Sequence, residues 1–124
     1  MDKITREKLK ERYEYHLKQI AKIEDLLKLD KVKAEKLLER ICVLENIDIN
    51  SIKGATRMQT IVMQRHCLIY LLYTNRYGSL AEVGKIFGNR DHSTVVHAKK
   101  NVLKMQDIDD FEYMDTLRTF EKYF

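Results

Sequence analysis

The chain has 124 residues, which is enough for one domain with a modest core. It contains no proline and only four glycines, and this composition favours an all-α fold. The amino terminus is charged from the start, and no apolar run approaches the length of a membrane span. We therefore expect a cytoplasmic protein and exclude a membrane protein.

The net charge of +4 is unevenly distributed along the chain. Residues 51–104 carry nine basic and two acidic side chains, a net of +7. Residues 105–124 carry two basic and six acidic side chains, a net of −4. A concentrated positive region is typical of nucleic-acid binding, although a solvated basic surface also explains such an excess.

Residues 4–29 have the pattern of an amphipathic helix, which we treat as an extension covering residues 1–30. Spacings of four and three alternate along one stripe, as in a coiled-coil seam formed by Leu9, Tyr13, His16, Ile20, Ile23 and Leu27. Leu17 and Leu26 widen the stripe. Two interpretations remain open: the helix packs on its own domain, or it pairs with a second copy in a homodimer.

A second helix is expected over residues 31–45, after a break or cap at Asp30. Its expected buried side consists of Ala34, Leu37, Leu38, Ile41 and Leu44. Residues 46–59 are expected to be irregular, because they contain the turn formers Asn46, Asp48, Asn50, Ser51 and Gly54.

A third helix is expected over residues 60–76, with Gly78 as its carboxyl-terminal stop. Its inward side chains would be Ile61, Leu68, Leu71 and Leu72. Cys42 and Cys67 lie beside apolar residues without metal-ligand spacing, so we expect both to be core residues in a reducing compartment.

Two short helices joined by a tight turn are predicted within residues 79–104. Ser79 and Glu82 have the spacing of a capping box at the start of the first helix. The second helix would turn Val95, Ala98 and Val102 towards the core, and its solvent-facing arc would hold Ser93, His97, Lys100 and Lys104. A last helix over about residues 108–123 would pack through Phe111, Met114, Leu117 and Phe120.

The first turn of the second short helix consists of polar residues, His92, Ser93 and Thr94. Such a turn can present hydrogen-bonding groups to base edges, and its backbone N–H groups suit a phosphate oxygen. A simpler interpretation is also open, in which the sole role of Asp91 is to cap the helix and the sole role of Thr94 is to begin it. His97 is better explained as a packed or surface histidine than as a base reader, and a metal shared with His92 is not expected.

The stretch Gly88–Ala98 closely resembles the signature of the C-terminal DNA-binding domain of the bacterial replication initiator DnaA. That signature has a glycine turn, Arg-Asp-His, two hydroxyl residues, Val, an aliphatic residue, His and Ala. The resemblance covers about residues 31–104, and residues 105–124 are compatible with the closing helix of the family. It implies a helix-turn-helix domain of this type over residues 31–124 that binds double-stranded DNA.

The resemblance also implies roles for the matching residues. The major groove would receive Arg90, Asp91, His92, Ser93 and Thr94. Arg57, on a small basic loop, would enter the adjacent minor groove, although Met58 and Gln59 follow where the family usually has basic residues. Arg65 and His66 would contact the phosphate backbone or a neighbouring base, and His66 replaces the usual glutamine. Lys99 and Lys100 would add phosphate contacts.

No segment matches the phosphate-binding pattern G-x-x-x-x-G-K-[ST], so we expect neither an ATPase module nor a bound nucleotide. We also expect no enzyme activity, cofactor or metal, since paired carboxylates and an activated nucleophile are not evident. The predicted function is sequence-specific DNA binding on the nucleoid, in origin recognition or regulation of replication or transcription, in a phage, a mobile element or a chromosome. The alternative is a protein-interaction adaptor that uses residues 4–29 and keeps the DNA-binding fold as a scaffold.

Overall fold

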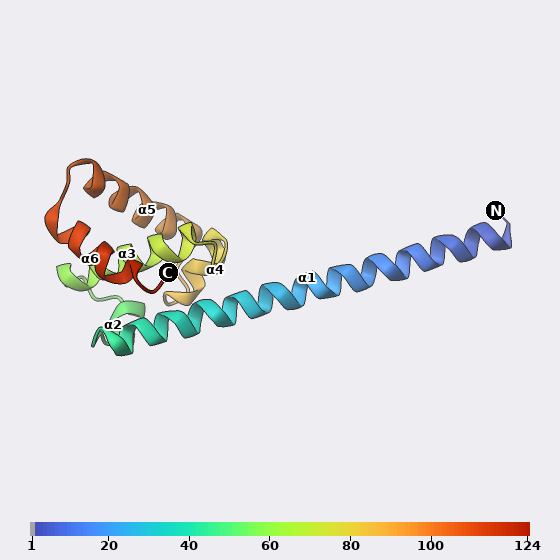
Figure 1. Ribbon diagram of the computed structural model, residues 1–124, viewed down its shortest axis with the longest axis horizontal. Helices are drawn as coiled ribbons and strands as arrows, with labels where there is room; N and C mark the ends of the chain where they lie inside the picture. The colour runs from blue at the N-terminus through green and yellow to red at the C-terminus, as the bar shows by residue number, and fades with distance from the viewer. Residues whose placement is uncertain (1) are drawn as a thin grey trace. The chain divides into compact units, whose positions relative to one another are not determined.

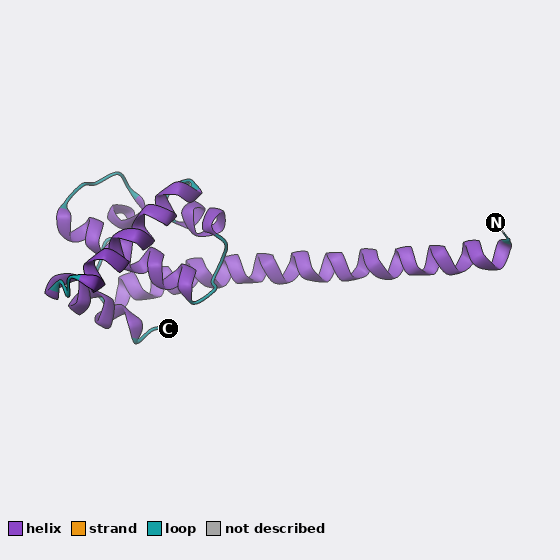
Figure 2. Ribbon diagram, turned by 90° about the horizontal axis from the view of Figure 1, so that it is seen from above, coloured by secondary structure: helices purple, strands orange, loops and turns teal. Residues whose placement is uncertain are grey.

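The computed structural model describes residues 2–124, with side chains described for residues 2–23 and 33–124. The regular elements are α1 (Lys3–Leu44), α2 (Ile49–Lys53), α3 (Gln59–Thr74), α4 (Leu80–Ile86), α5 (His92–Asp107) and α6 (Phe111–Glu121) (Figure 1). All of these elements are helices (Figure 2), so the all-α prediction is confirmed. The chain divides into two compact units, Met1–Asp30 and Lys31–Phe124.

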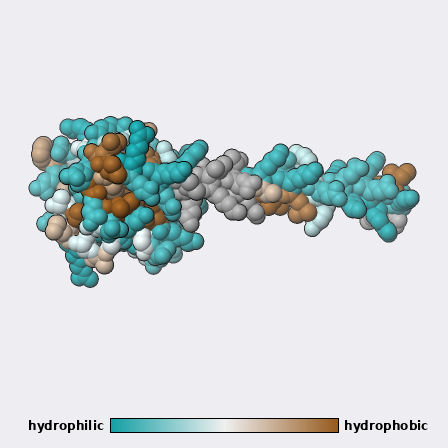
Figure 3. Space-filling view, turned by 90° about the horizontal axis from the view of Figure 1, so that it is seen from below, coloured by the Kyte–Doolittle hydropathy of each residue, from teal (hydrophilic) through white to brown (hydrophobic). Residues whose placement is uncertain are grey.

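Helix α1 does not break at Asp30, where a cap was expected. The neighbouring residues include neither glycine nor proline, and one aspartate inside a helix costs only a fraction of a kcal/mol, on the order of 0.7 or less, relative to alanine. Within residues 2–23, the apolar side chains of the predicted seam are exposed, from 46% for Leu9 to 65% for Tyr13. Figure 3 shows such hydrophobic atoms on this segment among hydrophilic ones. Leu26 and Leu27 lie outside the described side chains.

The core of the second unit is built around α3, which packs against α5 and α6, while α4 packs against α5. Helix α3 buries Cys67, Leu68, Ile69, Leu71 and Leu72. The other helices contribute Ala34, Leu38, Ile41, Cys42, Ile52, Val83, Ile86, Val95, Ala98, Val102, Leu117 and Phe120. Both cysteines are buried and free, as predicted.

Two residues expected in the core are exposed instead. Leu44 is 57% exposed, because it is the last residue of α1, and Cys42 takes the buried position on that turn. Phe111 is 80% exposed, because it directly follows the N-cap Asp110 at the outer end of α6.

Two predicted boundaries also differ. Residues 46–59 include the short helix α2, which Asp48 caps by accepting hydrogen bonds from the Asn50 N–H at 3.1 Å and the Ser51 hydroxyl at 3.0 Å. Helix α3 ends at Thr74, before Gly78, because Asn75 caps it and Arg76 adopts a positive φ of 63°. Since Arg76 already supplies the left-handed residue that closes a helix, Gly78 is not needed for that purpose.

Helices α4 and α5 form the predicted helix-turn-helix. Ser79 and Glu82 make the capping box that begins α4, with Ser79 Oγ accepting from the Glu82 N–H at 3.2 Å. The turn is tight, because a Cβ atom on Gly84 would lie 2.3 Å from the carbonyl oxygen of Arg90. Gly88 has a φ of +78°, which other residues rarely adopt. No helix that the structure describes is both long and apolar enough to cross a membrane.

Candidate nucleic-acid interface

The first turn of α5 presents polar side chains to solvent. His92 and Ser93 are exposed and Thr94 is half-buried. Asp91 is the N-cap, and its Oδ1 atom accepts from the Thr94 N–H at 3.2 Å and from both hydroxyl groups of Ser93 and Thr94. These hydrogen bonds, the one from the Ser93 hydroxyl above all, lower the pKa of Asp91 below its usual range. The helix start is therefore rigid and carries a charged carboxylate beside the exposed His92.

The body of α5 has the two faces that its sequence predicts. Val95, Ala98 and Val102 are buried, while the predicted solvent-facing arc from Ser93 to Lys104 is exposed. The two lysines differ: Lys100 is exposed, whereas the Nζ atom of Lys99 lies 5.2 Å from the ring centroid of Tyr73 on α3. Lys100 is thus the more accessible of the two cations, because the ammonium of Lys99 packs over an aromatic ring.

The segment Gly54–Met58, which we call the Arg57 loop, connects α2 to α3. Both Arg57 and Met58 are exposed, and Met58 exposes 66% of its surface. Arg57 therefore presents its charge to solvent, as the minor-groove expectation requires.

Arg65 is buried, and its side chain donates to backbone carbonyls of this loop and of the end of α2. Only 6% of its surface is exposed. Its Nε donates to the carbonyl of Ile52 at 2.7 Å, and one terminal nitrogen donates to Ser51 at 3.0 Å and Gly54 at 3.2 Å. The carbonyl of Thr56 accepts at 3.4 Å. This position differs from the expected phosphate contact, because the guanidinium donors already bind backbone carbonyls inside the protein.

Arg90 reaches the same loop from the turn before α5. It is half-buried, and its guanidinium donates to the carbonyls of Lys53, Gly54 and Phe87, the first at 3.1 Å. Gly88 also touches this region, since a Cβ atom there would lie 2.2 Å from the carbonyl oxygen of Lys53. Arg90 was expected in the major groove. In the structure its guanidinium instead donates to carbonyls at the end of α2 and so connects the turn to that helix.

Burial lowers the pKa of both arginines, and for Arg65 the positive charge of Arg90 adds to the shift. The two guanidinium groups therefore repel each other slightly, and the carbonyl oxygens between them offset this repulsion. The Gly54 carbonyl accepts from both.

His66 is partly buried. Its Nδ1 atom is 3.0 Å from the Asn101 side-chain nitrogen, which also donates to the Tyr113 hydroxyl at 2.8 Å. Burial lowers the pKa of His66 to about 4, and the neighbouring His97, with ring centroids 6.0 Å apart, adds to the shift. His66 is therefore neutral near pH 7 and links α3 to α5 and α6. This position differs from the expected contact with DNA.

Residues 34–102 match the family described as bacterial DnaA protein helix-turn-helix. The chain belongs to this family. It is also 34% identical over 89 residues to the chromosomal replication initiator protein DnaA of Ehrlichia ruminantium (strain Gardel), a match that covers 70% of this chain and 19% of that protein. The corresponding protein of Streptococcus thermophilus is 36% identical over 83 residues, which cover 67% of this chain and 18% of that protein. The part of the chain that matches thus covers about a fifth of the length of these relatives.

A DnaA-type helix-turn-helix is a DNA-binding, non-catalytic module, so this domain binds DNA. Asn101 and Tyr113 complete the polar junction around His66, and neither was predicted as a functional residue. The only sequence signal for Asn101 is its place beside the core position Val102 on an amphipathic helix, and Tyr113 has none.

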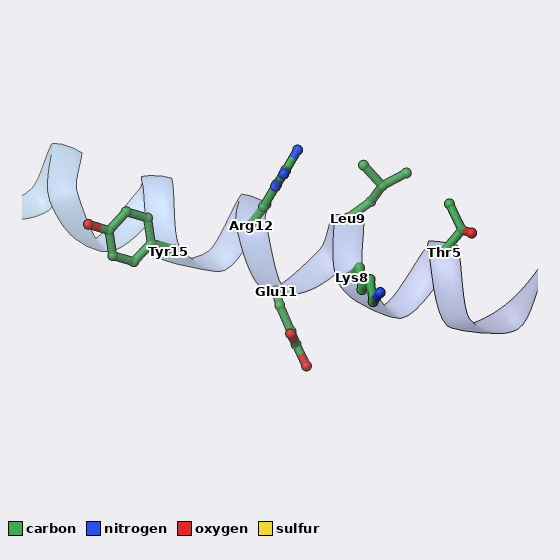
Figure 4. A pocket seen from close by; sticks show the side chains of 6 residues that line it. All are labelled: Thr5, Lys8, Leu9, Glu11, Arg12 and Tyr15. Atoms are coloured by element: carbon green, nitrogen blue, oxygen red, sulfur yellow. The ribbon is translucent and has the colours of Figure 1, made fainter.

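Among the described residues, no group of three or more His, Cys, Asp or Glu side chains could hold a metal ion. A surface hollow near the amino terminus is lined by Thr5, Lys8, Leu9, Glu11, Arg12 and Tyr15. Figure 4 shows that these side chains all come from one helix, α1, so the hollow is an open gap between neighbouring side chains.

Proposed function

We propose that this chain recognises specific double-stranded DNA sites, with the first turn of α5 in the major groove and Arg57 in the adjacent minor groove. The observation that carries the proposal is the pairing of two exposed elements, the α5 start and the Arg57 loop, through the carbonyl contacts of Arg90. The proposed contact residues are Arg57, Asp91, His92, Ser93, Thr94 and Lys100.

The chemistry of each element supports its proposed groove. Imidazole, hydroxyl and carboxylate groups at the α5 start can donate to or accept from base edges, which are distinct for every base pair in the major groove. The backbone N–H groups of the same turn can bind a phosphate. The minor groove is narrow and strongly negative over A·T-rich sequence, which favours an exposed guanidinium such as that of Arg57.

We further propose that the protein acts at the sites that replication initiators use, either in origin recognition or in regulation by occupying those sites. The names of the relatives support this choice, because both are chromosomal replication initiator proteins. A role in transcription regulation would use the same DNA contacts at other sites.

Fluorescence-anisotropy titrations with two duplexes test the proposal. The first, which we call the initiator-box duplex, carries a site that replication initiators use, and the second carries the same bases in scrambled order. With Arg65 and Arg90 turned inward, we expect about three to five neutralised phosphates, and log affinity should fall against log salt with a slope of roughly −3 to −4. The box duplex should bind more tightly than the scrambled one at each salt concentration. A flat salt response, or equal affinity for both duplexes, would contradict the proposal.

A second proposal concerns residues 4–29, which we propose form a homodimer through the exposed seam. Leu9, Tyr13, Ile20 and Ile23 each expose about half or more of their surface to water, between 46% and 65%, and pairing with a second copy would bury them. A dimer would carry two DNA-binding domains and would favour paired sites, because the second binding event becomes intramolecular.

Sedimentation of two charge variants of the full chain tests this dimer. Ile20→Glu places a charge in the seam, whereas Lys18→Glu places the same side chain on the opposite side of α1. We expect a dimer for the parent chain and for Lys18→Glu, and a monomer for Ile20→Glu. A monomeric parent chain would rule out the dimer and leave the seam for another protein, as the adaptor interpretation requires.

A further inference from the structure

We propose that Arg65 and Arg90 are positioning residues that fix the Arg57 loop against the turn before α5, so that the minor-groove and major-groove elements act as one preformed unit. The inference rests on the proposed function, because it explains how Arg57 is held for its contact. It also assigns the guanidinium donors of both arginines to backbone carbonyls of the protein rather than to the DNA.

The Arg57 loop has few hydrogen-bonding partners of its own. The structure assigns no regular secondary structure to residues 55–58, and the carbonyls at the end of α2 have no intrahelical donor. Arg65 supplies donors to Ser51, Ile52, Gly54 and Thr56, and Arg90 supplies them to Lys53 and Gly54. Two side chains thus bind the four successive carbonyls of residues 51–54 and the carbonyl of Thr56, directly before Arg57.

Arginine suits this task for two reasons. Its planar guanidinium carries five N–H donors in a fixed arrangement, so one side chain can bind several carbonyls whose directions differ. A positive charge at the carboxyl end of a helix is also favourable, and both groups lie at the end of α2. Neither arginine forms an ion pair with a carboxylate among the described residues. Their charges therefore add to the positive field around the Arg57 loop.

The contacts join two elements that are far apart in the sequence. Arg90 directly precedes the α5 cap Asp91, and its partners Lys53 and Gly54 lie 37 and 36 residues earlier. Gly88 in the same turn packs against the Lys53 carbonyl. Any displacement of the Arg57 loop would break contacts with the turn that begins α5. Binding in the two grooves should consequently be energetically coupled.

A double-mutant cycle on the full chain tests the coupling. Arg90→Lys keeps the charge but loses the planar group of donors, and it should weaken binding to the initiator-box duplex by about tenfold. In an Arg57→Ala background the same substitution should change affinity by less than about twofold, because the residue that it positions is already absent. Arg118→Lys, an exposed arginine on α6, is the matched control and should leave both affinities unchanged.

A modified duplex separates positioning from a contact that Arg90 makes with DNA directly. Replacing adenine by 2,6-diaminopurine adds an amino group to the minor groove and leaves the hydrogen-bonding groups of the major-groove edge in place. The parent chain should lose affinity on this duplex, whereas Arg90→Lys should lose little more than it has already lost. Equal losses for the parent chain and Arg90→Lys would overturn the inference.

Limited proteolysis gives a readout that does not need DNA. Trypsin cleavage after Arg57 should become several-fold faster in Arg90→Lys and in Arg65→Lys, since the loop is less firmly held, while cleavage after Arg118 should keep its rate. Unchanged cleavage at Arg57 in both variants would also overturn the inference. If the parent chain itself does not prefer the initiator box, the proposed function fails, and that result is recognisable without any variant.

Discussion

Arg57 and Arg65 carry the same charge on the same stretch of chain, but their surroundings are opposite. Arg57 is exposed in the loop, and Arg65 is 6% exposed with its donors on four backbone carbonyls. A basic residue near the proposed DNA-binding surface can therefore bind backbone carbonyls of its own protein, as Arg65 does. Burial and the partners of its donors decide whether it holds the protein together or binds the ligand.

The largest expected difference between the two arginines concerns folding stability. Arg65→Ala leaves buried carbonyls without donors, and each unsatisfied group costs about 1–3 kcal/mol, so we expect a loss of about 2–4 kcal/mol in the free energy of unfolding. Arg57→Ala should change it by less than about 0.5 kcal/mol, as is usual for an exposed side chain. Urea unfolding followed by circular dichroism measures both. Similar losses for the two variants would contradict the inference that Arg65 stabilises the fold and Arg57 does not.

The exposed residues should show the reverse behaviour, with an effect on DNA specificity and not on stability. His92→Ala removes a group expected at a base edge and should cost about 1–3 kcal/mol of binding free energy on the box duplex, with little effect on scrambled DNA. Arg118→Ala, at an exposed position on α6, is a control that should change neither affinity. An unchanged ratio between the two duplexes for His92→Ala would remove this residue from the proposed set of base readers.

The sequence predicted the local structure of α4 and α5 better than the contacts of the two inward-facing arginines. The helix start at Asp91, the buried positions Val95, Ala98 and Val102 and the capping box at Ser79 all follow from local patterns, and the structure has them. The role of Arg65 depends on carbonyls up to 14 residues away, and that of Arg90 on carbonyls 36 and 37 residues away. Helical periodicity contains no information about such contacts, because they form only when the loop and the turn meet in the fold.

The polar junction at His66 gives a third test, in which pH changes the stability of the interior. Burial lowers the pKa of His66 to about 4 from its ordinary value of 6.5, so the unfolded chain takes up a proton at a higher pH than the folded one. Stability from the neutral histidine is complete above pH 6.5 and falls as the pH decreases towards 4. Because His66 is only partly buried, we expect a loss of about 1 kcal/mol between pH 7 and pH 5.

Urea unfolding at a series of pH values measures this loss. His66→Gln keeps an acceptor for the Asn101 side chain but cannot titrate, so its stability should lack this part of the pH dependence. Arg118→Gln, at an exposed position on α6, should keep the dependence of the parent chain. If His66→Gln and the parent chain lose the same stability on acidification, the junction is not the pH-sensitive group.

The smallest expected effect separates two neighbouring lysines on α5. Lys100 is exposed, whereas the Lys99 ammonium packs over the Tyr73 ring, an interaction worth about 0.5–1 kcal/mol at a partly exposed site. Lys100→Ala should weaken binding to box and scrambled duplexes about equally and make the salt slope shallower by at most about one unit, since one phosphate contact is lost. Lys99→Ala should change the slope less, because that lysine must leave Tyr73 to reach a phosphate. Salt titrations of both variants measure the two slopes, and a larger change for Lys99→Ala would mean that packing against Tyr73 directs this lysine towards the DNA.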